Sequence, residues 1–297
     1  MTTITAKAPG KINPVLRAGP REESGYHELF TVFHAVDLWE SVTVKDADAF
    51  SVTLGGDLPL DQVPLDETNI VVQAGMALAA EIGHTGAAHL HIDKRIPVGG
   101  GMGGGSADAA AALVALNELW GNRADADTLH TLAAGLGADV PFARRGGSAL
   151  GRGNGSDLEP LASSSFFWVL MPIDHHLSTK EVYGHFDQLT QGDVEDLPSE
   201  LPTELIQALA SGDAETLSIF MENDLGPIAA DLYPRLISGL MDSEMGGALR
   251  TMVSGSGPTL VALTRDATHQ AELVQSLQDK GHRPIPTVST PRGAHLV

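Results

Sequence analysis

Cysteine and long hydrophobic runs are both absent from this 297-residue chain. Without cysteine the fold cannot rely on disulfide bonds and no thiol can act as a nucleophile, so a cytoplasmic location is the simpler expectation. The longest apolar run, Phe166 to Ile173, is far shorter than a membrane span and is typical of a buried strand. The first residues lack the apolar core of a signal peptide. We therefore expect neither a secretory leader nor a membrane anchor.

Basic residues are scarce as well. The chain has 18 lysines and arginines against 38 aspartates and glutamates, a formal net charge of −20 at pH 7. Non-specific nucleic-acid binding needs a basic surface, so we expect no nucleic-acid partner. An acidic protein that binds an anion must gather its positive charge in a cleft. Some of the lysines and arginines in the first half of the chain could serve there, or could equally be solvated surface charges. The candidates in the first half of the chain are Lys11, Lys94, Arg95, Arg144, Arg145 and Arg152.

Glycine, by contrast, is concentrated in one segment. Residues 97–107 read PVGGGMGGGSA, between a strand-like apolar run and an alanine-rich helical pattern. Glycine lets the backbone approach a ligand closely and adopt positive φ angles. Where such a loop opens a helix, its free N–H groups and the positive end of the helix dipole face the same point. The pattern predicts an anion site, most simply for phosphate, with Ser106 as the N-cap of the helix.

A linker, a dinucleotide-binding loop and a P-loop are the alternatives to this phosphate site. A flexible linker seldom lies between a strand and a capped helix. The glycines match G-x-G-x-x-G at Gly99, Gly101 and Gly104, but they do so in several registers. The acidic residue that a dinucleotide-binding fold requires after the next strand is also not in place. No G-K-[ST] follows the glycines, which excludes a P-loop.

The expected helices and strands are typical of an α+β fold without internal repeats. Strand patterns cover residues 3–8, 12–18, 30–38, 41–44, 50–54 and 88–92, and helical patterns cover 69–82, 106–120 and 125–136. The second half begins with a strand near Phe166, followed by an acidic loop or flap at Gln191 to Pro202 and three helical patterns. It ends with two strands around a turn at 254–257, a helix at 268–280 and a last strand. We expect two domains, residues 1–155 and 156–297.

Three further segments could bring chemistry to a bound phosphate. Lys11 and Asn13, in APGKIN, would lie on one face of a strand, where the ammonium could stabilise a transferring phosphoryl group. Tyr26 and His27, in SGYHE, offer a ring that stacks and an imidazole that donates to an anion. Asp139, in GLGADVPF, is placed to cap a helix, and beside a lysine its carboxylate could accept a hydroxyl proton. Each segment alone has a plainer interpretation: a solvent-facing lysine, a hairpin corner or a helix cap.

In this order the segments resemble the GHMP kinase superfamily, which includes galactokinase, homoserine kinase and mevalonate kinase. The resemblance rests on residues 8–13 (APGKIN), 25–29 (GYHEL), 96–110 (IPVGGGMGGGSADAA), 136–142 (LGADVPF) and 254–258 (SGSGP). It therefore spans nearly the whole chain. The pairing of APGKIN with GYHEL distinguishes members of the superfamily better than the glycine loop does. In this pairing the chain resembles the superfamily members of the non-mevalonate isoprenoid pathway.

The resemblance implies two α+β domains with the active site in the cleft between them. It implies transfer of the γ-phosphate of ATP to the 2-hydroxyl of a cytidine-diphosphate-linked methylerythritol, in a monomer or weak homodimer. Asp139 would be the general base and Lys11 its electrostatic partner, and Mg²⁺ would arrive with ATP, with no protein ligand assigned to the metal. The cytidine diphosphate derivative would contact Asn13, Tyr26, His27 and Tyr183. ATP would contact Pro97, Val98, Gly99, Gly100, Gly101, Met102, Gly103, Gly104, Gly105, Ser106 and Ala107.

Two other functions stay open. Another small-molecule kinase of the superfamily, of the homoserine or mevalonate type, would share the glycine loop, but GYHEL and Tyr183 weigh against it. A catalytically silent nucleotide-binding module on the same fold predicts loss of Lys11 or Asp139, and both are present. Some superfamily members have a second serine and then an amide at the two positions after Ser106. This chain has Ala107 and Asp108 there.

Overall fold

The computed structural model describes residues 2–23, 25–175 and 177–297. One group of strands comprises β1 (Thr3–Arg21), β2 (His27–Ala47), β3 (Ser51–Gly55), β4 (Ala87–Asp93), β5 (Ser148–Arg152), β6 (Asp157–Leu161), β8 (Glu222–Asn223) and β12 (His295–Leu296). A second group comprises β7 (Phe167–Met171), β9 (Arg250–Val253), β10 (Leu260–Thr264) and β11 (Ile285–Val288). The helices are α1 (Ile70–Glu81), α2 (Gly104–Leu119), α3 (Ala126–Leu136), α4 (Val140–Arg145), α5 (Thr179–Thr190), α6 (Thr203–Ser211), α7 (Ala214–Phe220), α8 (Leu225–Leu232), α9 (Arg235–Met245) and α10 (Ala267–Asp279).

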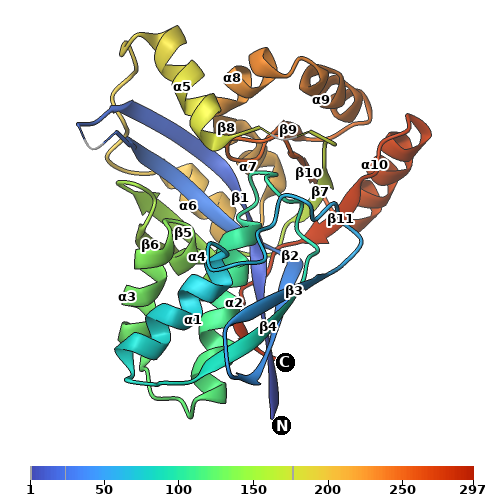
Figure 1. Ribbon diagram of the computed structural model, residues 1–297. Helices are drawn as coiled ribbons and strands as arrows, with labels where there is room; N and C mark the ends of the chain where they lie inside the picture. The colour runs from blue at the N-terminus through green and yellow to red at the C-terminus, as the bar shows by residue number, and fades with distance from the viewer. Residues whose placement is uncertain (1, 24, 176) are drawn as a thin grey trace.

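These strands form two sheets with helices packed against them (Figure 1). The larger sheet has the order β12-β1-β2-β4-β3, with β5 and β6 continuing from β2 and β8 beside β1. The smaller sheet has the order β11-β7-β10-β9. The mixture of helices and strands confirms the predicted α+β class. No helix within the described ranges is both long enough and apolar enough to cross a membrane.

β1 and β2 form a long curved hairpin that connects the two halves of the molecule (Figure 1). The sequence predicted each of them as two short strands, and this prediction was wrong. β1 continues through the proline and glycine at positions 9 and 10, and β2 continues through Trp39 and Glu40. The pairing register shifts between Pro9 and Gly10 and at two further points. A bulge absorbs an extra residue and bends a strand without ending it. The hairpin can therefore carry Lys11 in its middle and His27 near its tip.

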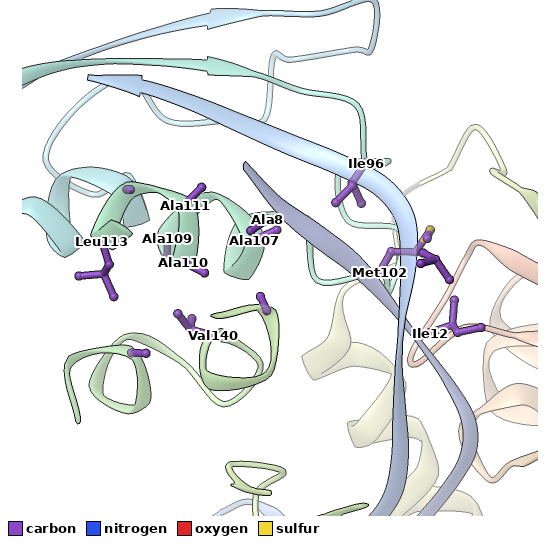
Figure 2. Close-up of a cluster of buried hydrophobic side chains, with 14 of the residues drawn as sticks. Ala8, Ile12, Ile96, Met102, Ala107, Ala109, Ala110, Ala111, Leu113 and Val140 are labelled. Carbon is purple, nitrogen blue, oxygen red and sulfur yellow. The ribbon is translucent and has the colours of Figure 1, made fainter. Parts of the chain in front are cut away.

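The core of the larger sheet depends on small side chains. Helix α2 lies against β1, and Figure 2 shows its alanines facing Ala8 of that strand and Val140 of α4. These alanines are fully buried, and their short side chains let the helix axis approach the sheet closely. Ile96 and Met102 extend the same cluster on either side of the first glycines of the loop. The apolar core therefore anchors the glycine loop at Ile96, before its first glycines, and at Met102, after them.

The two sheets meet at His34 of β2. Its Nδ1 lies 2.7 Å from Ser148 Oγ, its Nε2 lies 2.5 Å from Ser289 Oγ, and its ring packs 5.7 Å from the rings of Phe166 and Trp168. Complete burial lowers the pKa of His34 to about 4, so the ring is neutral in the folded chain. A neutral imidazole thus joins strands that come from both halves of the sequence.

The predicted domain boundary at residue 155 lies inside a hairpin of the larger sheet. Residues 157–161 form β6, which pairs with β5, and β12 at the far end of the chain pairs with β1. The division into residues 1–155 and 156–297 stays a prediction. Residues 191–202 contain neither helix nor strand, which confirms the loop predicted there.

Candidate active site

The glycine loop turns sharply before α2. Gly101 and Gly103 have φ angles of 75° and 69°, and Gly103 is the N-cap of the helix. Ser106 lies inside the first turn, so the predicted serine N-cap was wrong: a left-handed glycine starts the helix three residues earlier. The first N–H groups of a helix have no intrahelical acceptor, and the dipole is positive there. Residues 103–106 therefore present donors to an anion.

Ala107 lies outside this set of free N–H groups, and its predicted contact with ATP stays a prediction. Its N–H donates to the Gly103 carbonyl at 2.9 Å, and its side chain is fully buried in the core. The other predicted residues of the loop, 97 to 106, all line one cleft.

The glycine loop touches a second glycine-rich turn, residues 254–257. A Cβ on Gly101 would lie 2.1 Å from the carbonyl oxygen of Ser254, so no side chain fits there. A Cβ on Gly255 would lie 3.3 Å from Lys11 Nζ. Two turns far apart in the sequence thus meet beside the lysine, and glycine is what lets the backbones come so close.

Lys11 and Asp139 lie together at the start of α2. Lys11 Nζ is 3.5 Å from Asp139 Oδ2, and the backbone N–H of Lys11 donates to the Met102 carbonyl at 3.0 Å. A Cβ on Gly103 would be 3.2 Å from Lys11 Cγ and 3.7 Å from Asp139 Oδ2. Asp139 is the N-cap of α4 but makes no side-chain cap bond, so its carboxylate is directed to Lys11 rather than to its own helix. The cradle, an ammonium and a carboxylate therefore meet at one point.

Asn13 holds Lys11 in place. Lys11 Nζ donates to Asn13 Oδ1 at 2.7 Å, and Asn13 Nδ2 donates to Thr31 Oγ1 at 2.9 Å. Thr31 in turn donates to the Val15 carbonyl at 2.7 Å, which fixes the orientation of the amide. The same-face placement of Lys11 and Asn13 was predicted correctly. Thr31 was missed, because a threonine in a strand carries no signal of its own.

The cleft has a volume of about 1150 Å³ and extends to both sides of Lys11 and Asp139. Tyr26, His27 and Tyr183 line one end. His27 is buried, and its ring stacks on Tyr183 with 4.9 Å between centroids, whereas Tyr26 is 70% exposed. Burial raises the pKa of Tyr183, and the charges of Asp139 and Asp224 raise it further, so its phenol is neutral. This end offers aromatic faces.

The other end of the cleft was not predicted from the sequence. Its lining includes Gln62, Val63, Pro64, Thr68, Asn69 and Ile70, which precede and open α1. Asn69 is the N-cap of that helix and accepts the N–H of Val71 at 3.0 Å. The signal available in the sequence was a proline- and aspartate-bearing stretch before a helix, which is typical of any loop.

A buried ion cluster lies beneath this second end. Lys94 Nζ is 2.7 Å from Glu40 Oε1 and 2.7 Å from Asp108 Oδ2, and Glu40 also accepts the N–H groups of Arg95 and Ile96. Burial alone would lower the pKa of Lys94, but the two carboxylates outweigh it and raise that pKa. Burial raises the pKa of Asp108 to about 7, with Lys94 opposing the shift. Lys94 is therefore not a solvated surface charge, which was one of its two interpretations. Its ion pair with Asp108 joins the residues before and after the glycine loop.

The remaining bases do not reach the cleft. Arg95 lies 3.0 Å from Asp93, and Arg144 donates to the carbonyl of Ala126 at the surface. Arg95, Arg144, Arg145 and Arg152 do not appear among the described residues that line the cleft. Within that lining, positive charge comes from Lys11, Arg21, Lys94 and Lys180.

Comparison with known proteins identifies relatives of the whole chain. Residues 69–147 match the GHMP kinases N terminal domain, and residues 205–283 match the GHMP kinases C terminal domain. The chain is 45% identical over 281 residues to a 4-diphosphocytidyl-2-C-methyl-D-erythritol kinase of Streptomyces avermitilis, with 94% of each chain covered. It is 46% identical over 299 residues to the protein of that name from a Nocardioides species, covering 98% of this chain and 99% of the relative.

Solved structures show the same fold. A crystal structure of 4-(cytidine 5'-diphospho)-2C-methyl-D-erythritol kinase superposes with a TM-score of 0.76 at 30% identity, covering 97% of this chain and all of that one. A homoserine kinase from Cytophaga hutchinsonii superposes almost as well, with a TM-score of 0.75 over all of this chain and 98% of that one. At 20% identity that second match shows the fold alone.

Proposed function

The chain belongs to the 4-diphosphocytidyl-2-C-methyl-D-erythritol kinases within the GHMP kinases, and we propose that its cleft transfers the γ-phosphate of ATP to the 2-hydroxyl of that diphosphocytidyl substrate. The observation that carries the proposal is the meeting of Lys11, Asp139 and the first turn of α2 midway along one cleft. A phosphate donor and an alcohol acceptor entering from opposite ends would meet there.

The proposed mechanism assigns each group one task. The N–H groups of residues 103–106 hold the β- and γ-phosphates at the positive end of α2. Asp139 orients the acceptor hydroxyl and takes its proton as the new P–O bond forms, and the bond to the β-phosphate oxygen breaks. Lys11 pairs with that carboxylate and stabilises charge on the transferring phosphoryl group. The transition state of phosphoryl transfer is loose, so positioning and charge neutralisation supply most of the catalysis.

The two ends of the cleft suit two different nucleotides. The aromatic end, with Tyr26, His27 and Tyr183, offers ring faces for the cytosine of the acceptor. The end lined by residues 62–70 and Lys94 is left for the adenosine of ATP. The cleft is also large: its volume lies somewhat above the usual range for small-molecule sites.

We propose that Mg²⁺ enters bound to the phosphates of ATP. Mg²⁺ in kinases takes one or two carboxylates and completes its shell with phosphate oxygens and water. Asp139 is a carboxylate beside the phosphate cradle, so the site fits such an ion. When bound, the ion neutralises charge on the β- and γ-phosphates. The cytoplasmic location and the monomer or weak homodimer stay predictions.

The test is turnover with three acceptors: the diphosphocytidyl substrate, homoserine and mevalonate. We expect ATP consumption with the first only, and consumption with either of the others alone would overturn the assignment. Asp139→Asn and Lys11→Ala should each lower kcat by roughly 10²- to 10⁴-fold while ATP binding is retained. Lys7→Ala is the matched control, since Lys7 is on the same strand but lies over the Trp39 ring. Near-normal turnover in either cleft variant would contradict the mechanism.

A further inference from the structure

The hydroxyl of Thr259 is buried without a hydrogen-bond partner in the part of the chain that the structure describes. Thr259 lies between the glycine turn 254–257 and β10, and it is 1% exposed. A hydroxyl that loses water and gains no other partner lowers the stability of the fold. Folded chains keep few such groups, and the neighbours of this one indicate a use for it.

This hydroxyl lies against the glycine loop. A Cβ on Gly100 would be 2.6 Å from Thr259 Oγ1, so the oxygen packs directly on the backbone of Gly100. Gly100 lines the cleft, whereas Thr259 is not among the described residues that do so. Thr259 therefore meets the loop from the side that faces away from the cleft.

The turn that carries Thr259 is held at both of its ends. The Thr259 carbonyl accepts the N–H of Ser254 at 2.8 Å, which closes the turn. Asn223 of β8 donates through Nδ2 to the carbonyls of Val253 and Gly255, both at 2.8 Å. The backbone on which the Thr259 hydroxyl is mounted is therefore well fixed.

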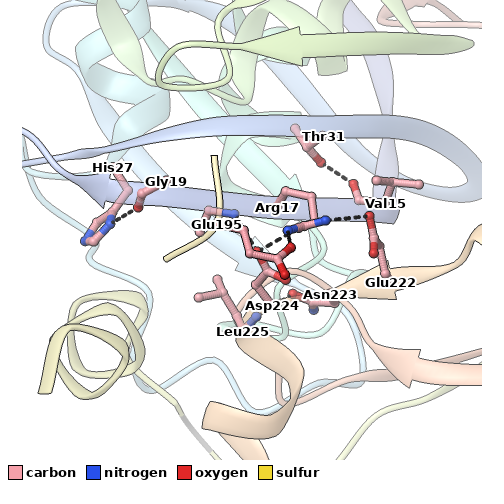
Figure 3. Close-up of polar contacts among 11 residues, drawn as sticks. Val15, Arg17, Gly19, His27, Thr31, Glu195, Glu222, Asn223, Asp224 and Leu225 are labelled. Atoms are coloured by element: carbon pink, nitrogen blue, oxygen red, sulfur yellow. Dashed lines mark hydrogen bonds and ion pairs between the residues drawn. The ribbon is translucent and has the colours of Figure 1, made fainter. Parts of the chain in front are cut away.

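β8 is itself attached to the long hairpin, because it pairs with β1. Figure 3 shows Arg17 of β1 paired with the two residues on either side of Asn223. Arg17 Nη1 lies 3.7 Å from Glu222 Oε1, and Arg17 Nε lies 3.2 Å from Asp224 Oδ2. The turn is thus anchored, so a change that gives Thr259 a partner has to come from the glycine loop.

The next carbonyl of the loop already has a hydroxyl partner from this turn. Ser254 Oγ, at the start of the turn, donates to the carbonyl of Gly101 at 3.4 Å. Thr259, at the end of the turn, lies against Gly100. The two torsions that rotate the peptide between Gly100 and Gly101 both belong to glycines, so this rotation meets no Cβ.

A bound phosphate would turn this peptide in the direction that Thr259 needs. In a planar trans peptide the N–H and the C=O point to opposite sides. When the N–H of Gly101 points into the cleft toward a phosphate, the carbonyl of Gly100 points away from the cleft. That is the side on which the Thr259 hydroxyl lies, and the hydroxyl gives up no other hydrogen bond by donating there.

We propose that Thr259 is a positioning residue for ATP: when the phosphates bind, its hydroxyl donates to the Gly100 carbonyl and holds the Gly101 N–H toward them. This inference rests on the proposed function, because it takes the glycine loop as the phosphate site. One peptide unit rotates, and the rest of the loop keeps its conformation. Binding also gives a partner to a buried hydroxyl, so the free enzyme contributes to the affinity through the unpaired group that it carries.

The first test compares Thr259→Val with Thr259→Ser. Valine has the shape of threonine without the hydroxyl. The melting temperature of the nucleotide-free protein should therefore rise by about 2–4 °C, while the affinity for a non-hydrolysable ATP analogue, measured by calorimetry, falls roughly ten-fold. Serine keeps the hydroxyl but leaves a methyl-sized gap, so the melting temperature should fall while the affinity stays within about three-fold of the wild type. Affinity that follows the melting temperature in both variants would indicate a merely structural role and overturn the proposal.

Thr287→Val is the matched control. Thr287 of β11 is also buried, its hydroxyl also has no hydrogen-bond partner among the described residues, and it is not one of those that line the cleft. The same substitution there should raise the melting temperature by a similar amount and leave the affinity for the ATP analogue unchanged. An equal loss of affinity in the two valine variants would count against a specific role of Thr259.

The second test follows the Gly100 carbonyl by carbon-13 NMR, since an accepted hydrogen bond moves a carbonyl resonance downfield. The resonance should move downfield when the analogue binds to the wild type or to Thr259→Ser, and should not do so in Thr259→Val. The same movement in the valine variant would overturn the proposal.

CDP distinguishes the two ends of the cleft. Thr259→Val should leave CDP affinity unchanged, and an equal loss for CDP and the ATP analogue would refute a role that is specific to the phosphate donor. Failure of the proposed function would appear in the wild type instead, as absence of analogue binding and of turnover with the diphosphocytidyl substrate.

Discussion

Acid should destabilise this fold through His34. The folded chain buries His34 as a neutral ring with a pKa of about 4, while the unfolded chain protonates it at its ordinary value of 6.5. As the pH falls below 6.5 the unfolded state therefore binds more protons, and the free energy of unfolding decreases. The whole difference corresponds to roughly 3 kcal/mol, of which about 2 kcal/mol is lost between pH 7 and pH 5.

The substitution that isolates this effect is His34→Gln. Glutamine keeps a donor and an acceptor for the hydroxyls of Ser148 and Ser289, but it does not titrate. Urea unfolding at pH 7 and pH 5, followed by tryptophan fluorescence, gives the free energy of unfolding for both proteins. Between those pH values the wild type should lose about 2 kcal/mol more than the variant. Equal losses would refute the reasoning, whatever the absolute stability of the variant.

Comparison with the variant is necessary because Asp108 acts in the opposite direction over the same pH range. Its carboxyl has a raised pKa of about 7, so its stabilising contribution is present below 3.8 and is lost as the pH rises through 7. The two groups partly cancel in the wild type.

Two further predictions concern the glycine loop and the ion cluster beneath it. Asp108→Asn removes the buried titrating carboxyl. As the pH rises from 5 to 7, the free energy of unfolding of the wild type should fall by on the order of 2 kcal/mol more than that of this variant in the same urea assay. An equal pH dependence of the two free energies would contradict the raised pKa of Asp108. Gly101→Ala places a Cβ 2.1 Å from the Ser254 carbonyl at a φ of 75°, so kcat/KM for ATP should fall by at least ten-fold. Gly135→Ala, where a Cβ has open space on α3, should keep activity and raise stability by about 0.5–1 kcal/mol; equal activity in the two glycine variants would show that the close approach is unimportant.

The parts of the site that the sequence predicted are those fixed by local chemistry. A glycine run before an alanine helix produces a phosphate cradle wherever it folds, and Lys11 and Asn13 share a face because strand side chains alternate. The structure places all the predicted site residues except Ala107 along one cleft. Ala107 lies outside the cleft lining because the helix starts at the left-handed Gly103, so the Ala107 N–H is used within the helix.

The parts that the sequence did not predict depend on partners far along the chain. The sequence left Lys94 open between the cleft and the solvated surface, because its partners are 54 and 14 residues away, at Glu40 and Asp108. His27 Nε2 lies 3.2 Å from Asp187 Oδ1, and this contact depends on how α5 docks on the hairpin, which no local pattern reports. The long strand β1 was divided at its proline and glycine because a bulge leaves the same signal as a strand end, and β2 was divided at Trp39 and Glu40, where its pairing with β1 also shifts.

The pair between Lys94 and Asp108 has a consequence for how the enzyme receives its nucleotide. It joins the residues on either side of the glycine loop and so turns that stretch into a closed ring, with six glycines inside it. Glycine loses more conformational entropy on ordering than any other residue, and ring closure removes much of that freedom when the chain folds. The loop is therefore preorganised, and the nucleotide does not have to order it on arrival. A segment that is flexible by composition becomes rigid by connectivity.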